Sequence, residues 1–368
     1  MQAPSWPTAS AQHQPSLTVD ASGTLCETQN NITFVRNTHF WGEHIMMNST
    51  SLTRRQSLGL AASAGMLLAG GGRACAAQFP DHTINFIVPY AAGGDFDSYV
   101  REFCGVLTKS LGVNVEPINQ PGAAGAEAVF TLSMDPPDGY NMCIANLPGL
   151  LHVKPKPGFD VNKMTWLANL GRDTLGLAVA ANSPIHSIAD LQALSKQRAI
   201  KMSSSGKASA DYLVSKIIAG VFNLNVSIVS GYEGSVSSMI AVARGDVDVT
   251  VHSLASIANM AKSKLMRLMF VFADKSPVPG IEDATSVNQP NLGKLFQFRT
   301  VVAPPNLPPE IATKLSNALV AAVKSPEVQA WAAKIQTTLY PMNQQETLAM
   351  IAEQEHLLET YKGFLAAP

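Results

Sequence analysis

Residues 88–103 read VPYAAGGDFDSYVREF and pass from an apolar run to a helical pattern through a loop of small residues. The run before them, INFIV at residues 84–88, predicts a buried strand. Gly93 and Gly94 let backbone N–H groups approach a bound group closely, and the start of the next helix adds partial positive charge. The loop therefore predicts either an anion-binding turn or a plain connection between strand and helix.

Apolar runs and helical patterns alternate along most of the chain after residue 79. This alternation predicts an α/β fold in which mostly parallel strands are flanked by helices on both faces. We expect a helix whose N-cap is Ser187, and further helices at residues 96–111, 125–134, 309–324, 326–335 and 344–364. We expect strands at residues 84–90, 113–119, 141–147, 175–181, 199–205, 226–232, 247–253 and 266–273.

Two places in the sequence resemble domain boundaries. An apolar strand enters a Ser-Pro turn near residue 178, and a second strand enters a proline-rich turn after residue 297. A chain that leaves one lobe and later returns to it would make residues 78–177 and 298–368 lobe 1, and residues 178–297 lobe 2. Two crossover strands would then join the lobes and leave a cleft at the carboxyl ends of their strands, where open α/β sheets bind ligands.

Three loops share one plan, in which a strand leads through glycine or serine into a helix. They are AAGGDFD after the first strand, SSSGKASADYL at residues 203–213 and SGYEGSVSSMI at residues 230–240. Each loop offers backbone N–H groups and hydroxyls at a helix start. Together they predict a site for an anion, most simply a carboxylate, that is held by dipoles and hydrogen bonds.

Several charged residues near these loops have two interpretations. Asp97 in a first helical turn either caps its helix, with Arg101 as its i,i+4 partner, or contacts the ligand. His252 at a strand end either faces the cleft or is satisfied where it lies. Arg299 interrupts an apolar strand, so it either extends to solvent or meets an anionic ligand.

Composition and motifs limit the function. The 368 residues carry a formal net charge of −1 and no basic stripe, which argues against a nucleic-acid partner. The chain has no GxSxG, HExxH or GxxxxGK[ST] motif, and no complete GxGxxG follows the first strand. No CxxC or His/Cys cluster indicates a metal. We therefore expect no enzyme activity, no cofactor and no metal.

The N-terminal region predicts export. Residues 1–48 show no sustained periodicity and are expected to be disordered, or to precede the true start at Met46 or Met47. Residues 49–76 join two adjacent arginines to a short apolar stretch and end in a cleavage pattern, which is typical of a twin-arginine export signal that is cut near Ala76. Of the later cysteines, Cys104 and Cys143 either pair in an oxidising compartment or pack as thiols, and the pattern favours thiols.

An ordered set of motifs resembles a known family. The set consists of VPYAAGGDFDSYVR (88–101), NQPGAAG (119–125), PPDGY (136–140), SSSGKAS (203–209), GYEGS (231–235), ARGDVDV (243–249) and VVAPPNLP (301–308). In this order they resemble the exported solute receptors of tripartite tricarboxylate transporters, also called Bug-type periplasmic binding proteins. The resemblance covers residues 79–363. It implies a two-lobed Venus-flytrap fold and capture of a small carboxylate in the periplasm for the membrane subunits of a transporter.

The resemblance also implies a set of ligand-facing residues, and we expect a monomer. The chain departs from the family pattern at Glu233, Tyr212 and Ala208, where lysine, histidine and glycine are usual, so the identity of the carboxylate stays open. A protein that reports its ligand to a sensor kinase, or a hydrolase or transferase on a similar scaffold, are the alternatives. The expected ligand-binding residues are Tyr90, Ala91, Ala92, Gly93, Gly94, Asp97, Ser205, Gly206, Ser209, Tyr232, Gly234 and Ser235.

Overall fold

The computed structural model describes residues 18–19, 25–26, 79–153 and 159–366. The chain divides into two compact units, Met1–Gly72 and Arg73–Pro368. In the first unit, β1 (Thr18–Val19) pairs with β2 (Leu25–Cys26) in antiparallel fashion. The rest of the predicted leader at residues 1–48, and the whole predicted export signal at residues 49–76, lie outside the described residues.

The second unit is built on one continuous mixed sheet. Its main path runs β4-β3-β5-β12-β6-β9-β7-β8, while β10 and β13 also pair with β6, and β11 pairs with β10. The strands that form it are β3 (Ile84–Val88), β4 (Val115–Asn119), β5 (Asn141–Leu147), β6 (Thr165–Ala180), β7 (Ile200–Ser204), β8 (Val226–Ser230), β9 (Val249–Ser253), β10 (Met266–Val271), β11 (Glu282–Asp283), β12 (Phe296–Ala303) and β13 (Leu339–Met342).

Strand β6 joins the two halves of this sheet. Its first part pairs with β12 from Thr165 to Thr174, and its second part pairs with β9 from Leu175 to Val179. We refer to the elements on the β12 side as lobe 1 and to those on the β9 side as lobe 2. The strand predicted at residues 175–181 is therefore only the second half of β6, and its first half was not predicted.

The parallel and antiparallel pairs lie in different places. β3 pairs in parallel with β4 and β5, and β7 pairs in parallel with β8 and β9. All pairs made by β6 and β12 are antiparallel. The predicted α/β class is confirmed, and the antiparallel part arises where the chain crosses between the lobes.

The helices begin and end where local signals place them. α2 ends at Gly112 with φ 75°, the left-handed conformation that glycine adopts easily. Ser187 caps α4 as predicted, and Asn343 with Glu346 forms a capping box on α10. The helices are α2 (Asp95–Leu111), α3 (Ala126–Leu132), α4 (Ile188–Ser195), α5 (Ala210–Val221), α6 (Ser235–Arg244), α7 (Leu254–Lys262), α8 (Pro309–Val323), α9 (Pro326–Ile335), α10 (Gln344–Thr360) and α11 (Lys362–Ala366), with short 3₁₀ turns η1 (Ala123–Gly125), η2 (Gly149–His152), η3 (Val161–Lys163) and η4 (Pro290–Lys294).

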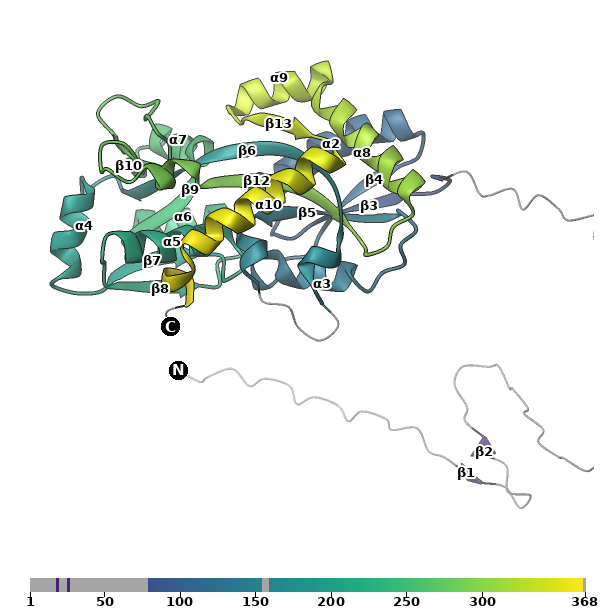
Figure 1. Cartoon of the computed structure of the whole chain (residues 1–368), viewed down its shortest axis with the longest axis horizontal. Coiled ribbons are helices and arrows are strands. Elements are labelled where there is room, and N and C mark those ends of the chain that lie inside the picture. The colour runs from purple at the N-terminus through teal and green to yellow at the C-terminus, as the bar shows by residue number, and fades with distance from the viewer. Residues whose placement is uncertain (1–17, 20–24, 27–78, 154–158, 367–368) are drawn as a thin grey trace, which may run out of the picture. The chain divides into compact units, whose positions relative to one another are not determined.

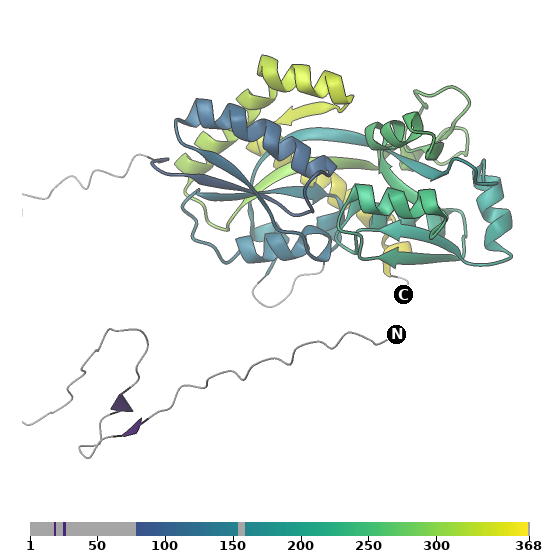
Figure 2. The same ribbon diagram turned by 180° about the vertical axis from the view of Figure 1, so that it is seen from behind.

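Helices cover both faces of the sheet in each lobe, as Figures 1 and 2 show from opposite sides. In lobe 1, α2 and α8 share a core with Phe86 and Ile144, while α3 and the start of α10 pack on the other face with Ile87 and Cys143. In lobe 2, α4 and α5 pack on one face and α6 and α7 on the other. Alternate residues of each strand thus point into different cores.

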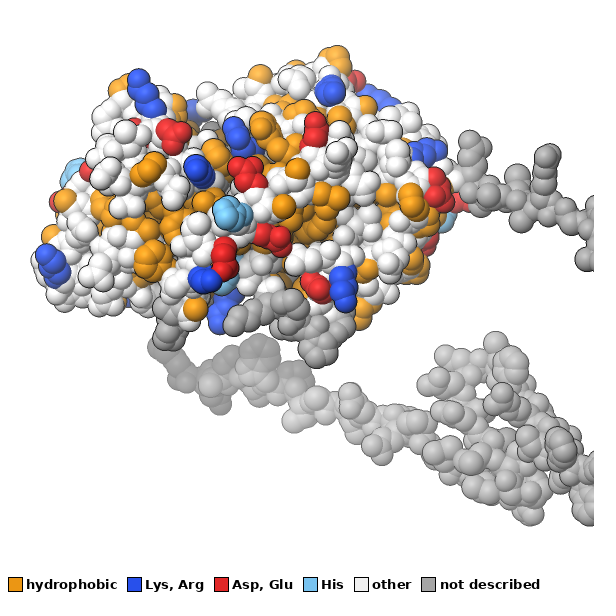
Figure 3. Space-filling model, in the orientation of Figure 1, with side chains coloured by type: hydrophobic (Ala, Val, Ile, Leu, Met, Phe, Trp, Pro, Cys, Tyr) orange, Lys and Arg blue, Asp and Glu red, His pale blue; other side chains and the backbone are white. Residues whose placement is uncertain are grey.

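The C-terminal helices span both lobes. Met350 and Ile351 of α10 belong to a lobe 1 core, whereas Leu357, Leu358 and Tyr361 belong to the core of lobe 2. The sequence assigned all of residues 298–368 to lobe 1, but the end of this segment packs on lobe 2. The face that α10 crosses carries acidic and basic side chains that are interspersed (Figure 3).

Two further features concern the buried cysteines and the length of the apolar helices. Cys104 and Cys143 are both buried free thiols, so the interpretation as packed thiols is confirmed. Burial raises the pKa of Cys104 to about 12, which keeps this thiol protonated. Within the described part of the chain, no helix is both long and apolar enough to cross a bilayer.

Candidate ligand-binding site

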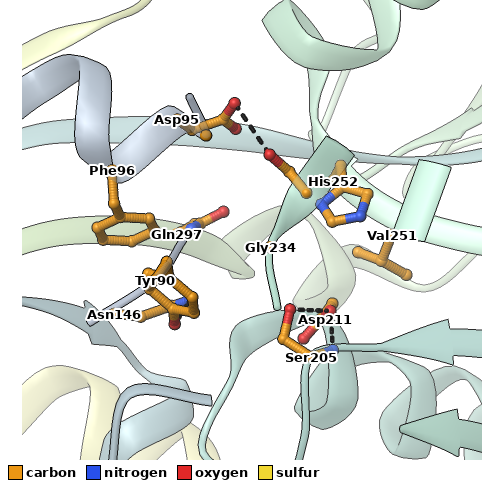
Figure 4. A pocket seen from close by; sticks show the side chains of 12 residues that line it. Tyr90, Asp95, Phe96, Asn146, Ser205, Asp211, Gly234, Val251, His252 and Gln297 are labelled. Carbon is orange, nitrogen blue, oxygen red and sulfur yellow. Dashed lines mark hydrogen bonds between the residues drawn. The ribbon is translucent and has the colours of Figure 1, made fainter. Parts of the chain in front are cut away.

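A small cavity lies between the lobes, at the carboxyl ends of β3, β5, β7 and β9 (Figure 4). Its volume is about 30 Å³, more than the roughly 10–15 Å³ that one water molecule needs. None of its lining residues is a lysine or arginine. They are Tyr90, Gly94, Asp95, Phe96, Asn146, Ser205, Asp211, Gly234, Ser235, Val251, His252 and Gln297.

A wider hollow adjoins this cavity and shares Tyr90 and Ser205 with it. Its volume is about 330 Å³, and Gly206 and Tyr232 also line it. The lobes touch at its edge, where the amide of Ala91 donates to the carbonyl of Glu233 over 3.3 Å. The structure therefore shows lobes that are in contact around the predicted site.

The first loop uses its two glycines differently. Gly93 has φ +82°, which favours glycine, whereas Gly94 is extended with φ −84° and ψ 179°. Gly94 is the N-cap of α2 and gives this helix no side-chain cap. The amides of the first turn of a helix have no intrahelical partner, so the uncapped start of α2 presents unsatisfied donors at the cavity.

Asp97 is turned into lobe 1. Its carboxylate accepts from the amide of Gly93 (2.8 Å), from Nε of Arg101 (2.9 Å) and from Nδ2 of Asn119 (2.9 Å). Burial opposes ionisation of Asp97, but these hydrogen bonds outweigh it and lower the pKa of the carboxyl group. The predicted Asp97–Arg101 pair is confirmed, and Asp97 does not line the cavity.

Asp95 is turned the opposite way, across the cleft. One oxygen accepts from the hydroxyl of Ser235 (3.2 Å), and the other accepts from Ser253 (3.3 Å) and Ser256 (2.6 Å). These serines belong to lobe 2, at the starts of α6 and α7. The Asp95 side chain, which is 23% exposed, thus forms a polar bridge between the lobes.

Tyr90 and Asn146 form the lobe 1 floor of the cavity. The Tyr90 hydroxyl donates to the carbonyl of Ala124 (3.1 Å) and accepts from Nδ2 of Asn146 (3.0 Å). Oδ1 of Asn146 is buried and has no hydrogen-bond partner among the described residues. A buried acceptor without a partner is costly, so this atom favours a donor from a bound molecule.

The second loop satisfies most of its own polar groups. The amide and hydroxyl of Ser205 donate to Asp211, and the amide of Gly206 donates to the hydroxyl of Ser204. Ser209 caps α5, and its hydroxyl donates to the carbonyl of Gly206 and lies against the carboxyl group of Asp211. Burial raises the pKa of Asp211, which favours its neutral form inside the cavity wall.

The third loop resembles the first because α6 starts at Gly234 without a side-chain cap. Behind it, Nε2 of His252 lies 2.9 Å from the hydroxyl of Ser238, in a buried cluster with Ser203 and Thr250. Burial lowers the pKa of His252, so its neutral form is favoured. His252 does line the cavity, which was one of its two predicted interpretations.

Arg299 is buried beneath the start of α2 and reaches neither solvent nor the cavity lining. Its Nη2 lies 2.5 Å from Asp173 and 3.8 Å from Asp95, and its guanidinium packs against the rings of Phe96 and Tyr99. The sequence predicted that Arg299 either extends to solvent or meets an anionic ligand. The structure shows neither, because Arg299 forms a buried ion pair with Asp173.

The predicted ligand-binding residues divide into three groups. Tyr90, Gly94, Ser205, Gly234 and Ser235 line the cavity, and Gly206 and Tyr232 line the adjoining hollow. The members of the set that line neither space are Ala91, Ala92, Gly93, Asp97 and Ser209.

Sequence reasoning missed six lining residues, which are Asp95, Phe96, Asn146, Asp211, Val251 and Gln297. The position of Asn146 at the carboxyl end of a predicted strand could have indicated it, and Asp211 stands in a first helical turn after a serine-rich loop. No signal distinguished Asp95 from Asp97. Across the described ranges, no group of three or more His, Cys, Asp or Glu side chains is placed to hold a metal ion.

Comparison with known proteins gives consistent results. The sequence model of the tripartite tricarboxylate transporter family receptor matches residues 100–359, which is more than half of the chain. A UPF0065 protein from the gbd 5' region of Cupriavidus necator is 27% identical over 305 residues, covering 81% of this chain and 92% of that protein. A UPF0065 protein of Bordetella bronchiseptica is 29% identical over 299 residues, covering 78% of this chain and 88% of that protein.

Solved structures share the fold. The match to the periplasmic binding protein BugD has a TM-score of 0.70 and 19% sequence identity, and it covers 78% of this chain and 98% of BugD. The match to MatC from Rhodopseudomonas palustris with bound malate has a TM-score of 0.70 and 19% identity, and it covers 78% of this chain and 100% of MatC. The match to an R. palustris protein with adipate has a TM-score of 0.70 and 22% identity, and it covers 78% of this chain and 98% of that protein.

Proposed function

Because the chain belongs to the tripartite tricarboxylate transporter receptor family, we propose that it captures a small carboxylate between its lobes and delivers it to transporter membrane subunits. The protein binds this ligand without converting it. In this proposal residues 49–76 direct export and are removed near Ala76, so that the receptor acts in the periplasm. It acts there as a monomer. Intact-mass analysis of exported protein tests the expected start near Ala77.

The observation that carries the proposal is the contrast between helix starts at the cleft. α2 and α6 begin at glycines without side-chain caps, one from each lobe, and both glycines line the same cavity. Their free first-turn amides and positive dipole ends favour an anion placed between them. Closure of the two lobes therefore completes one anion site from two incomplete halves.

The electrostatics of the lining suit a ligand of small charge. Burial favours the neutral forms of Asp211 and His252, and the lining holds no lysine or arginine. A carboxylate would then be held by oriented amides and hydroxyls, which are effective in a site shielded from water. Malate and adipate, bound by the structural neighbours, belong to the same chemical class.

A thermal-shift screen of the purified protein against mono-, di- and aromatic carboxylates tests the proposal. A ligand at about 100 times its dissociation constant adds about 2.7 kcal/mol to the free energy of unfolding. Absence of a shift with every carboxylate, together with a shift by another ligand class, would contradict the proposal.

Gly94→Val links a positive result to the cleft. A Cβ at Gly94 would lie 3.7 Å from the carbonyl oxygen of Ala91 and 3.9 Å from the Ser235 hydroxyl, so a methyl group fits but the larger valine fills the ligand space. Calorimetry should show loss of binding. Gly105→Val, in the same helix with open space around it, is the matched control and should bind normally.

A further inference from the structure

The Asp95 carboxylate is itself bound in the way that the cleft is expected to bind a ligand carboxylate. It belongs to lobe 1 but accepts hydrogen bonds from three hydroxyls of lobe 2, at 3.2, 3.3 and 2.6 Å. Two of these hydroxyls stand at helix starts, on Ser235 as the first residue of α6 and on Ser253 as the N-cap of α7. Hydroxyl donors and helix starts together stabilise a negative charge.

This arrangement occupies a hydroxyl group that was expected to donate to the ligand. Ser235 belongs to the predicted ligand-binding set, and its hydroxyl donates to Asp95 instead. Both oxygens of Asp95 already have donors, and Nη2 of Arg299 lies 3.8 Å from one of them. The negative charge of Asp95 is therefore satisfied within the protein and does not need a cation from a ligand.

On the opposite side of the cavity, one buried acceptor lacks a hydrogen bond from any described residue. Oδ1 of Asn146 is a buried acceptor that lacks a partner among the residues described, and the Asn146 side chain lines the same cavity as Asp95 (Figure 4). A second carboxylate cannot donate to this oxygen, whereas a hydroxyl group can. The two sides of the cavity thus disfavour a second negative charge for independent reasons.

We propose that Asp95 occupies a second anion subsite of the cleft and makes the protein selective for a carboxylate with an uncharged hydrogen-bond donor at its far end, such as a hydroxy acid, over a dicarboxylate. This inference rests on the proposed function and names the ligand class of the same cavity. Asp95 acts in two ways, because it fills the hydroxyl cluster of lobe 2 and repels a like charge beside it.

Paired ligands that differ by one charged group test the inference. The probes are succinate, glutarate and adipate against 4-hydroxybutyrate, 5-hydroxypentanoate and 6-hydroxyhexanoate, with affinities measured by calorimetry at constant pH and salt. For the pair that fits best, the unaltered protein should bind the hydroxy acid roughly tenfold or more tightly than the dicarboxylate. Asp95→Ser removes the charge and leaves a hydroxyl, and it should reduce this ratio to about threefold or less.

Three further variants separate charge from folding and from the hydrogen bonds. Asp95→Asn keeps the size of the side chain, tests the charge alone, and replaces the serine variant if that one fails to fold. Ser256→Ala removes the shortest of the three bonds but keeps the charge, so the preference for the hydroxy acid should remain. Asp190→Asn makes the same charge change in the first turn of α4, outside the cavity lining, and should leave the ratio unchanged.

The outcomes distinguish this inference from the proposed function. A dicarboxylate that binds the unaltered protein as tightly as its hydroxy acid would overturn the inference and support the proposed function. An unchanged ratio in both Asp95 variants would do the same. If no member of either series binds any of the proteins, the inference is overturned, and the wider carboxylate screen alone decides the proposed function.

Discussion

Four helices begin at the cleft, and they begin in two different ways. α5 and α7 are capped by their own serines, since Ser209 accepts from the amide of Tyr212 and Ser253 accepts from the amide of Ser256. α2 and α6 begin at Gly94 and Gly234, which offer no side-chain cap. A side-chain cap satisfies one amide of the first turn within the protein, whereas an uncapped start leaves that amide to a partner as well.

This difference separates structural loops from binding loops that look alike in sequence. The loop between β7 and α5 carries the hydroxyls of Ser205 and Ser209, yet Ser209 is buried and bonded within its own loop and to Asp211. The loop before α2 contributes no hydroxyl at its N-cap, and this leaves its amides exposed to the cavity. The number of polar side chains in a loop is therefore a poor guide to the donors that remain for a ligand.

The largest expected effect concerns the support beneath the uncapped start of α2. Arg299→Met removes the partner of Asp173 and leaves a buried charge without compensation. Breaking a buried pair in this way costs about 3–5 kcal/mol of unfolding free energy. Urea denaturation measures the change, and Arg198→Met is the control because its pair with Asp248 is 48% exposed on the arginine side and should cost under about 1 kcal/mol.

A small effect of Arg299→Met, similar to that of Arg198→Met, would mean that α2 is held in place by its apolar face alone. The contacts of Arg299 with Phe96 and Tyr99 would then add little to the stability of the protein.

The second prediction converts an uncapped start into a capped one. Gly234 has extended backbone that any residue adopts, and a Cβ there would meet no atom within 4 Å. Gly234→Asp should cap α6, keep or slightly raise stability, and weaken carboxylate binding by about 1–3 kcal/mol because it fills the site and adds a like charge. Calorimetry and thermal unfolding of the same preparation measure both effects.

Gly245→Asp is the control for the charge that Gly234→Asp adds, because Gly245 also has open space and lines neither the cavity nor the hollow. The φ of +82° at Gly245 makes that substitution strained, so only its effect on affinity is compared. Equal losses of affinity in both variants would remove the start of α6 from the site.

Much of the fold could be predicted because its signals are local. The bounds of α9 agree with the prediction, and Ser187 caps α4 because serine before an apolar run is a strong N-cap signal. The first half of β6 was missed. This part of the strand contains Gly171, Arg172 and Asp173, which lack the apolar pattern of a strand, and pairing with β12 and β13 decides its conformation.

The site was predicted less completely because its chemistry depends on tertiary contacts. Asp95 and Asp97 both stand in the first turn of α2 and are equivalent by local rules. Residues two apart on a helix point to different sides, so one faces Arg101 in its own lobe and the other faces serines more than a hundred residues away. Only the packing of lobe 2 against lobe 1 determines which aspartate enters the cavity.

The third prediction concerns the buried histidine behind α6. Burial lowers the pKa of His252 below its usual value near 6.5, although Asp211 and Asp95 act against this shift. The unfolded chain therefore binds more protons than the native protein below about pH 6.5, and His252 destabilises the protein as the pH falls, by up to about 1.4 kcal/mol per pH unit. The raised pKa of Asp211 has the opposite effect, since its native carboxyl group retains a proton that is lost as the pH rises.

His252→Gln removes the imidazole together with its charge interaction with Asp211, whose carboxyl group is present in both proteins. The unfolding free energy of the unaltered protein should fall more steeply between pH 6.5 and pH 5 than that of the variant, in urea titrations at each pH. Parallel curves would show that His252 is protonated to the same extent in the native and unfolded states.

The smallest expected effect tests the capped side of the comparison. The Ser209 hydroxyl accepts from the amide of Tyr212, donates to the carbonyl of Gly206 and lies against Asp211, while Ser209 lines neither space between the lobes. Ser209→Ala should therefore lower the unfolding free energy by about 1 kcal/mol, the usual cost of losing a serine cap. Carboxylate affinity should stay within about twofold, because one hydrogen bond to a charged ligand would be worth clearly more than that. Ser187→Ala removes the equivalent cap from α4, whose start does not line the cavity, and it should give the same loss of stability. A large loss of affinity in Ser209→Ala alone would show that this serine exchanges its cap for the ligand when the lobes close, so that a capped helix start at the cleft can still take part in binding.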